Sequence, residues 1–122
     1  MIWWRSILFI YGAVGVHPDD ADKVDAAVLD EIRRYCDMEK TVAVGEIGLD
    51  YYWHKEKEEH LLQQKVFRQQ MDIAREKQLP FIIHSRDAAE DTLNIVKEYM
   101  RTGCMVELSI AFPIAKKLRE SI

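Results

Sequence analysis

Residues 41–53, TVAVGEIGLDYYW, constrain the fold more than any other part of this chain. The first half of this stretch is apolar on both faces that a strand would present, as is typical of a parallel strand covered by helices. The apolar run stops at a carboxylate, Glu46, which has a glycine on either side. We therefore predict a buried strand over residues 41–47, followed by a loop over residues 48–54.

Two further apolar runs also stop at a polar side chain. Residues 8–16 lead to His17, and a run introduced by a proline gives a predicted strand over residues 81–84 that stops at His84. Strands that each deliver a metal-binding or proton-transferring group at their carboxyl ends are typical of the top of a parallel β/α sheet or barrel. We expect His17, Glu46 and His84 to cluster at one end of the strands.

Segments with helical periodicity separate these runs. The pattern predicts helices over residues 19–36, 55–78 and 87–103, then a fourth strand over residues 104–110 and a last helix over residues 113–122. In the longest helix we place the apolar residues on the inner side and the charged and amide side chains elsewhere. The inner residues are Leu62, Val66, Phe67, Met71, Ile73 and Ala74.

The order of these elements fixes the fold class. Strand and helix alternate four times, with no internal repeat, low-complexity stretch or linker, and this alternation is typical of α/β proteins. Four units would make a small open sheet, or half of an eight-unit barrel. We predict a partial TIM-type (β/α) barrel with about four parallel β/α units, forming one domain across residues 1–122.

Composition limits the partners and the compartment. The net charge of −4 gives no broad basic surface, so nucleic acid would have to be held by local groups or bound cations. Cys36 and Cys104 have neither zinc-clamp nor disulfide-scaffold spacing, which favours a reducing, cytoplasmic setting. The apolar N-terminus contains Arg5 and is too short to span a bilayer, so we expect an internal strand there and no membrane partner.

Glu46 and His84 are the first candidates for a metal site. A carboxylate and an imidazole on neighbouring strands can share a divalent cation, which would offset the cost of burying the carboxylate. On position alone, Glu46 could equally cap the following loop or pair with Arg86. His84 could be a hydrogen-bonded core histidine, and His17 a ligand, a proton donor or a loop residue.

Candidate substrate-binding residues follow the second and third predicted strands. Arg86 can make a bidentate contact with a phosphate, or it can pair with Asp87 or Glu46. Tyr51 begins an aromatic cluster of three residues, YYW, whose rings could stack on bases or could cover the top of a barrel. His54 and His60 lie in a charged stretch and are interpreted as surface residues.

Three motifs together carry a family resemblance. GVHPDD around His17, VGEIGLDYY around Glu46 and FIIHSRDA around His84 resemble, in order and spacing, the TatD family of metal-dependent deoxyribonucleases. The resemblance is strongest over residues 11–98. It implies an amidohydrolase-like TIM barrel with two divalent cations, of the Mg, Mn or Zn type, that hydrolyses phosphodiester bonds in DNA.

The resemblance also implies roles for individual residues. Glu46 matches the bridging metal ligand and is the first catalytic candidate, and His84 matches a ligand of one ion. His17, the second catalytic candidate, and Arg86 match groups near the scissile phosphate. Asp50 matches an acidic position that we expect to orient its neighbours.

The chain departs from the family pattern in three places. The family begins with a His-x-His strand and later carries an HCFSG-like histidine and a late aspartate, and the sequence contains none of these. Residues 98–122 resemble a later β/α unit, so we expect an incomplete domain whose fourth strand pairs directly with the 81–84 strand or leaves a gap beside it. Glu46 and His84 alone would hold two ions poorly, which predicts weak metal binding and poor or absent hydrolysis of DNA.

Three functions remain open from the sequence. The first is a TatD-like nuclease that acts on DNA. The second is an amidohydrolase-like enzyme that cleaves a small lactone, ester or amide with the same metal pair. The third is a truncated, non-catalytic fragment with a structural or interacting role.

Overall fold

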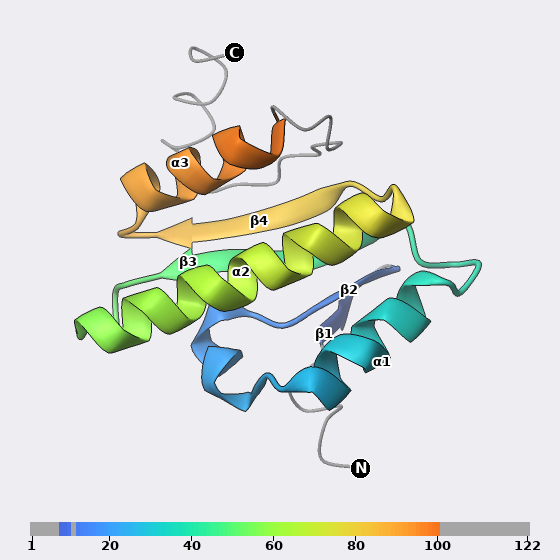
Figure 1. Cartoon of the computed structure of the whole chain (residues 1–122), viewed down its shortest axis with the longest axis horizontal. Coiled ribbons are helices and arrows are strands. Elements are labelled where there is room, and N and C mark those ends of the chain that lie inside the picture. The colour runs from blue at the N-terminus through green and yellow to red at the C-terminus, as the bar shows by residue number, and fades with distance from the viewer. Residues whose placement is uncertain (1–7, 11, 101–122) are drawn as a thin grey trace.

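The computed structural model describes residues 8–10 and 12–100. Its described part is a four-stranded sheet in the order β1-β2-β3-β4, with helices packed against it (Figure 1). Strands β2 (Ala13–Gly15), β3 (Ala43–Asp50) and β4 (Phe81–Arg86) pair in parallel. The α/β class is confirmed, with three parallel strands in this part. The predicted strand over residues 104–110, its junction with the preceding unit and the last helix lie outside the described residues.

The predicted first strand over residues 8–16 is wrong in its continuity. It is divided into β1 (Leu8–Ile10) and β2, which pair antiparallel in a tight hairpin. Gly12 lies at the turn with a φ of 84°, a left-handed conformation that a glycine adopts without steric cost. An apolar run broken by one glycine therefore reverses direction, so only its second half joins the parallel set.

Strand β3 extends further than the sequence suggested. The predicted strand end at residue 47 and the predicted loop from Gly48 are wrong, because β3 continues to Asp50 and its pairing with β4 reaches Arg86. The register slips between Gly45 and Ile47, so Glu46 has no partner in the ladder. Glu46 therefore lies at a β-bulge within the strand, and Asp50 occupies the strand end.

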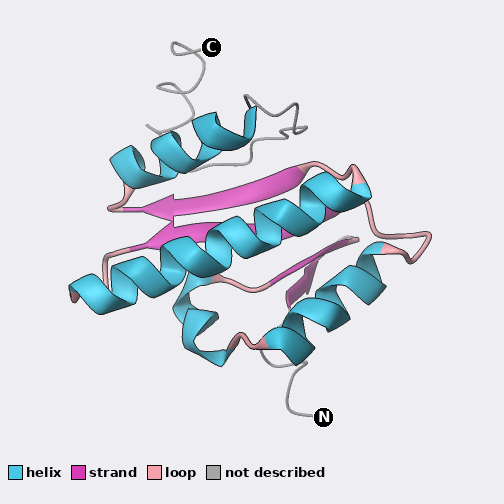
Figure 2. Cartoon of the chain, in the orientation of Figure 1, coloured by secondary structure: helices cyan, strands magenta, loops and turns pink. Residues whose placement is uncertain are grey.

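The helices connect the strands as predicted, with shifted ends. The predicted helix over residues 19–36 is divided into a 3₁₀ segment, η2 (Pro18–Lys23), and α1 (Ala26–Cys36), because Val24 and Asp25 between them are extended and Asp25 caps α1. Helix α2 (Lys57–Lys77) crosses β3, and α3 (Ala89–Met100) lies along β4 (Figure 2). Among the helices of the described ranges, none combines the length and apolarity that a bilayer crossing needs.

The buried face of α2 differs from the prediction at one leucine, which is exposed, and at two glutamines, which are buried. Leu62 is 36% exposed, whereas Gln63 and Gln70 are 3% and 1% exposed. The remaining predicted inner residues of this helix are buried, namely Val66, Phe67, Met71, Ile73 and Ala74. Two amides therefore belong to the buried stripe, and their partners are described with the site.

Cys36 gives a simple test of the core. Its side chain is buried at the end of α1, and burial raises the pKa of its thiol to about 11. A thiol with a raised pKa stays protonated at neutral pH and is a poor nucleophile. We expect Cys36 in a Cys104→Ser background to react with a thiol reagent at pH 7.5 only after urea is added. Rapid labelling of the native protein would contradict the packing of α1.

Candidate metal centre

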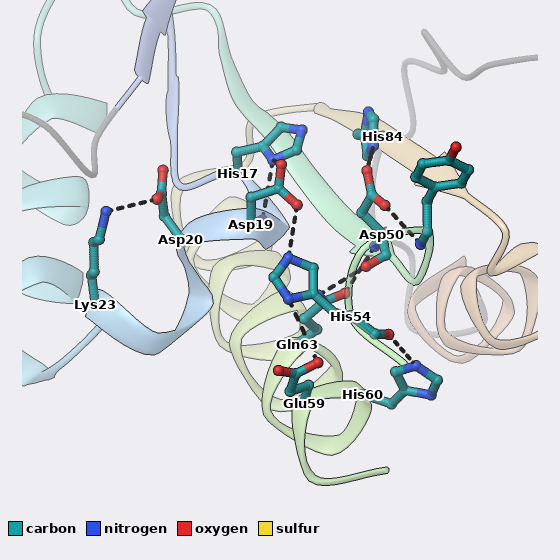
Figure 3. Close-up of polar contacts among 11 residues, drawn as sticks. His17, Asp19, Asp20, Lys23, Asp50, His54, Glu59, His60, Gln63 and His84 are labelled. Carbon is teal, nitrogen blue, oxygen red and sulfur yellow. Dashed lines mark hydrogen bonds and ion pairs between the residues drawn. The ribbon is translucent and has the colours of Figure 1, made fainter. Parts of the chain in front are cut away.

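Three side chains expected from the strand ends meet at one place. One possible ligand atom from each of His17, Glu46 and His84 lies within 4.8 Å of the other two. They come from the residue before η2, the bulge of β3 and the middle of β4, and Figure 3 shows His17 and His84 near each other. The ring centroids of the two histidines are 4.4 Å apart. The structure therefore brings together two nitrogen donors and one carboxylate.

The bulge in β3 explains why a carboxylate can occupy this place. Seven of the eight residues of β3 are buried, and Glu46 is the one that is not. A bulge adds a residue to one strand and re-aims its side chain relative to the pleat. Because the Glu46 side chain remains 40% exposed, its carboxylate keeps access to water or to an ion.

Asp50 holds His84 from the other side. Its buried carboxylate accepts a hydrogen bond from His84 Nε2 through Oδ2 at 2.9 Å, and Oδ1 accepts from the backbone N–H of Tyr52 at 3.0 Å. An imidazole with its proton on Nε2 keeps a lone pair on Nδ1. His84 Nδ1 lies 3.8 Å from Glu46 Oε1, too far for a hydrogen bond between them. Asp50 thus occupies the orienting position that its motif suggested.

His17 is also fixed by a local hydrogen bond. It caps η2, and its Nδ1 accepts the backbone N–H of Asp19 at 3.1 Å. Burial lowers the pKa of His17, and the nearby His84 acts in the same direction, while Asp19 and Glu46 raise it. A neutral His17 that accepts at Nδ1 bears its proton on Nε2.

Two glutamines of α2 form hydrogen bonds with backbone groups next to the candidate metal centre. Gln70 accepts from the N–H of Val16 at 2.7 Å and donates to the carbonyl of Val16 at 3.2 Å. Gln63 makes the same pair of bonds with Asp50, at 2.8 and 3.0 Å. Each amide satisfies backbone groups that a buried strand end would leave unpaired. The spacing of seven residues along one helix stripe is the sequence signal for these two glutamines, and the prediction that amides lie away from the inner side is wrong for them.

Replacing Gln70 by leucine should destabilise the protein. Leucine fits the buried stripe but leaves the N–H and C=O of Val16 without partners, at a cost of about 1–3 kcal/mol for each unsatisfied group. We expect urea unfolding to show a loss of about 2–6 kcal/mol for the two groups together. The half-buried neighbour Gln69, changed to leucine, is the matched control and should lose less than about 1 kcal/mol. Equal stability of both variants would contradict the role of Gln70.

Arg86 and Tyr52 adjoin the candidate site, because Arg86 follows His84 by two residues in β4 and the backbone N–H of Tyr52 donates to Asp50. Ser85 Oγ contacts Thr92 of α3, so His84 and Arg86 face the opposite side of β4. The Arg86 guanidinium carbon lies 3.8 Å from the centroid of the Tyr52 ring. Within the described ranges, Arg86 forms no ion pair with Glu46 or Asp87, the partners considered from the sequence.

Tyr51 does not join this group. Its ring is 9% exposed and stacks on His60 at 3.6 Å, and its hydroxyl donates to Asp91 at 2.8 Å. Burial raises the pKa of the Tyr51 hydroxyl to about 12, and the Asp91 carboxylate acts in the same direction. The prediction that Tyr51 binds substrate stays a prediction, and the exposed rings of the cluster are Tyr52 and Trp53.

The two remaining histidines are partly buried rather than free surface residues. His54 Nε2 lies 3.1 Å from Asp19, and its Nδ1 lies 3.6 Å from Glu59 (Figure 3). His60 Nε2 bonds the backbone carbonyl of His54 at 2.6 Å. These contacts link the loop after β3 to η2 through Asp19 and to α2 through Glu59 and His60, beside a pocket of about 160 Å³ that Asp19, His54 and Glu59 help to line.

This combination of fold and site defines a class. Histidine and carboxylate donors that converge at the tops of parallel β/α strands are typical of metal-dependent hydrolases built on barrel folds. A model of the TatD-related DNase family matches residues 4–112. The chain belongs to this family, as the three motifs indicated.

Curated relatives match about three quarters of the chain. It is 48% identical over 90 residues to the uncharacterized metal-dependent hydrolase YabD of Bacillus subtilis, covering 74% of this chain and 34% of that protein. It is 32% identical over 92 residues to the 3'-5' ssDNA/RNA exonuclease TatD of a Pantoea species, covering 75% and 35%. The chain therefore spans about a third of the length of these relatives.

Solved structures support the same fold. The TatD homologue YjjV of Escherichia coli matches with a TM-score of 0.71 at 26% identity, over 90% of this chain and 43% of that one. A TatD-family hydrolase of Entamoeba histolytica matches with a TM-score of 0.61 at 33% identity, over 75% and 32%. The prediction of a partial TIM-type barrel is confirmed.

Proposed function

We propose that this chain carries part of a metal-dependent active site that hydrolyses phosphodiester bonds in DNA. The observation that carries the proposal is the meeting of His17, Glu46 and His84 within 4.8 Å on a TatD-family fold. One relative is named as a 3'-5' exonuclease of single-stranded DNA and RNA, which supports a nucleic-acid substrate.

The donor set suits a divalent cation. Two ligand atoms that share an ion at about 2.1 Å lie no more than roughly 4.2 Å apart, and His84 Nδ1 and Glu46 Oε1 are 3.8 Å apart. Asp50 holds the opposite nitrogen of His84, which is how outer carboxylates orient histidine ligands in metal sites. Glu46 and His84 would hold the ion. When bound, such an ion supplies positive charge to phosphate oxygens and acidity to water.

The other residues would act on the substrate directly. His17, with its proton on Nε2, can donate a hydrogen bond to an oxygen of the scissile phosphate. Arg86 presents an exposed guanidinium two residues beyond His84 on the same side of β4 and can pair with the phosphate through two N–H groups. Together they would stabilise the charge that develops on phosphorus oxygens.

The availability of Arg86 favours a phosphodiester over a small ester or amide. A neutral lactone or amide gives a guanidinium no anionic partner, whereas a phosphate gives one. Because Arg86 rests on Tyr52 rather than on a carboxylate, its charge is not neutralised by a neighbour within the described part. The amidohydrolase alternative therefore has less support from this site.

A labelled single-stranded oligonucleotide tests the proposal. We expect slow release of nucleotides by the purified chain with Mn²⁺ or Mg²⁺, because Glu46 and His84 would supply two ligands and a two-ion site needs more. Only cleavage that is lost with EDTA and in both Glu46→Ala and His84→Ala counts as support. Cleavage of p-nitrophenyl acetate but not of the oligonucleotide would favour the amidohydrolase alternative. Cleavage of neither, at high protein concentration, would favour a non-catalytic chain.

A further inference from the structure

An exposed group of rings and cations lies immediately beside the metal centre. We call it the aromatic platform, and it consists of Tyr52, Trp53, Lys55 and Arg86. Trp53 is 71% exposed and Tyr52 is 39% exposed, and their rings meet edge to face at 4.5 Å. Arg86 covers the Tyr52 ring at 3.8 Å, and the Lys55 ammonium lies 5.5 Å from the same ring.

The platform is fixed to the metal centre through one carboxylate. Asp50 Oδ1 accepts the backbone N–H of Tyr52, while Oδ2 of the same side chain accepts from His84. Asp50 and Arg86 are also register partners in the β3–β4 ladder. The loop that carries the rings therefore begins from the residue that orients the candidate ligand His84.

Tyr52 and Trp53 differ in how much of each ring is available to a ligand. The guanidinium of Arg86 occupies one face of Tyr52, and the edge-to-face contact orients Trp53 without stacking on it. A mostly exposed indole in contact with a ring that two cations flank can stack a planar ligand while the cations hold an attached anion. A nucleotide has both parts, a flat base and a phosphate.

We propose that the aromatic platform binds an unpaired nucleotide of the substrate, with its base stacked on Trp53 and a phosphate held by Arg86 and Lys55. This inference rests on the proposed function and adds the way in which the site would select single strands. A base inside a duplex has both faces covered by its neighbours, so a ring can stack only on an unpaired or terminal base.

Charge favours nucleic acid over a protein partner at this surface. The chain has a net charge of −4, yet the rings are flanked by an arginine and a lysine. A negatively charged chain has little general attraction for polyanions, so a local pair of cations at exposed rings gives the phosphate contact that binding needs.

The test measures binding without hydrolysis. Fluorescence anisotropy of labelled oligonucleotides in EDTA separates the platform from the metal site. We expect a thymidine decamer to bind more tightly than a decamer of the same length built from abasic sites, and more tightly than a blunt duplex. Trp53→Ala should weaken binding of the thymidine decamer at least about fivefold and leave the abasic decamer unchanged. Trp53→Phe should keep most of the affinity.

Met38 provides the matched control. It is 51% exposed, as an apolar side chain in the turn that precedes β3, whereas Trp53 follows β3. Met38→Ala should leave binding of all three probes unchanged. Equal binding of the thymidine and abasic decamers, or equal binding by wild type and Trp53→Ala, would overturn the proposal.

Two mixed outcomes separate the platform from the proposed function. Binding of the decamer that depends on Trp53, with no hydrolysis when metal is added, would support the platform and contradict the nuclease. Metal-dependent hydrolysis without any effect of Trp53→Ala would do the reverse.

A change in oligomeric state in Trp53→Ala, with unchanged decamer binding, would assign the surface to contacts between copies of the chain and overturn nucleotide binding.

Discussion

A Gly48→Ala protein should lose most of its folded population. Gly48 has a φ of 141°, and a methyl group added to it would lie 2.0 Å from the carbonyl oxygen of His84. Gly48 and His84 are register partners in the paired backbones of β3 and β4. Neither backbone can move away from the added methyl group without opening the ladder between the two strands. The unfavourable φ adds a cost of about 1–3 kcal/mol. We expect urea unfolding followed by circular dichroism to show a total loss of about 4 kcal/mol or more.

Gly15→Ala is a graded control for the same kind of change. A methyl group there would lie 3.1 Å from the nearest backbone atoms of Gly45, and Gly15 does not have a left-handed φ. A displacement of a few tenths of an ångström relieves such a contact, so we expect a smaller loss of about 1–2 kcal/mol. If Gly48→Ala were as stable as Gly15→Ala, the close approach of β3 to His84 would be contradicted.

Much of the fold could be predicted because its patterns are local. Apolar runs at residues 41–47 and 81–84 correspond to β3 and β4, and the helical stripe between them corresponds to α2. The patterns could not predict where the backbone reverses direction. A hairpin and one straight strand would both need apolar residues before and after Gly12, and the structure forms a hairpin because Gly12 adopts a φ of 84°.

The end of β3 could not be predicted for a related reason. A polar residue in an apolar run is the usual signal for the end of a strand, and Glu46 gave that signal. The bulge leaves Glu46 without a partner in the ladder, while β3 continues to Asp50. The polar residue in the apolar run therefore marks the bulge and not the end of the strand.

The sequence could predict the members of the site and the orienting position of Asp50, but not the two supporting glutamines. His17, Glu46 and His84 could be placed together because parallel strands present their carboxyl ends at one edge. Gln63 and Gln70 could not, because a buried amide is recognised only by the backbone groups it meets, and those lie in other elements. For the same reason, the separation of Tyr51 from the exposed Tyr52 and Trp53 depends on the contact of Tyr51 with Asp91.

Glu46→Gln should abolish measurable binding of a divalent cation. The substitution keeps the size of the side chain and removes the only carboxylate in the group with His17 and His84. Loss of an outer-shell partner typically weakens metal affinity about 10–100-fold, so we expect loss of a direct ligand to cost at least about 100-fold. Isothermal titration with Mn²⁺ or Zn²⁺ measures the change. Glu90→Gln, an exposed carboxylate on α3, removes the same charge and should leave the affinity unchanged.

Asp50→Asn distinguishes an orienting carboxylate from a ligand. The asparagine oxygen can still accept from His84 Nε2, but without its charge it polarises the imidazole less, so we expect affinity to fall about tenfold while folding is retained. Metal should raise the melting temperature of the wild-type chain, raise that of Asp50→Asn less, and leave that of Glu46→Gln unchanged, because an ion stabilises only a folded state that binds it. A loss in Asp50→Asn equal to that in Glu46→Gln would make Asp50 a ligand itself. Unchanged binding in Glu46→Gln would remove the carboxylate from the metal centre and with it the physical basis of the proposed hydrolysis.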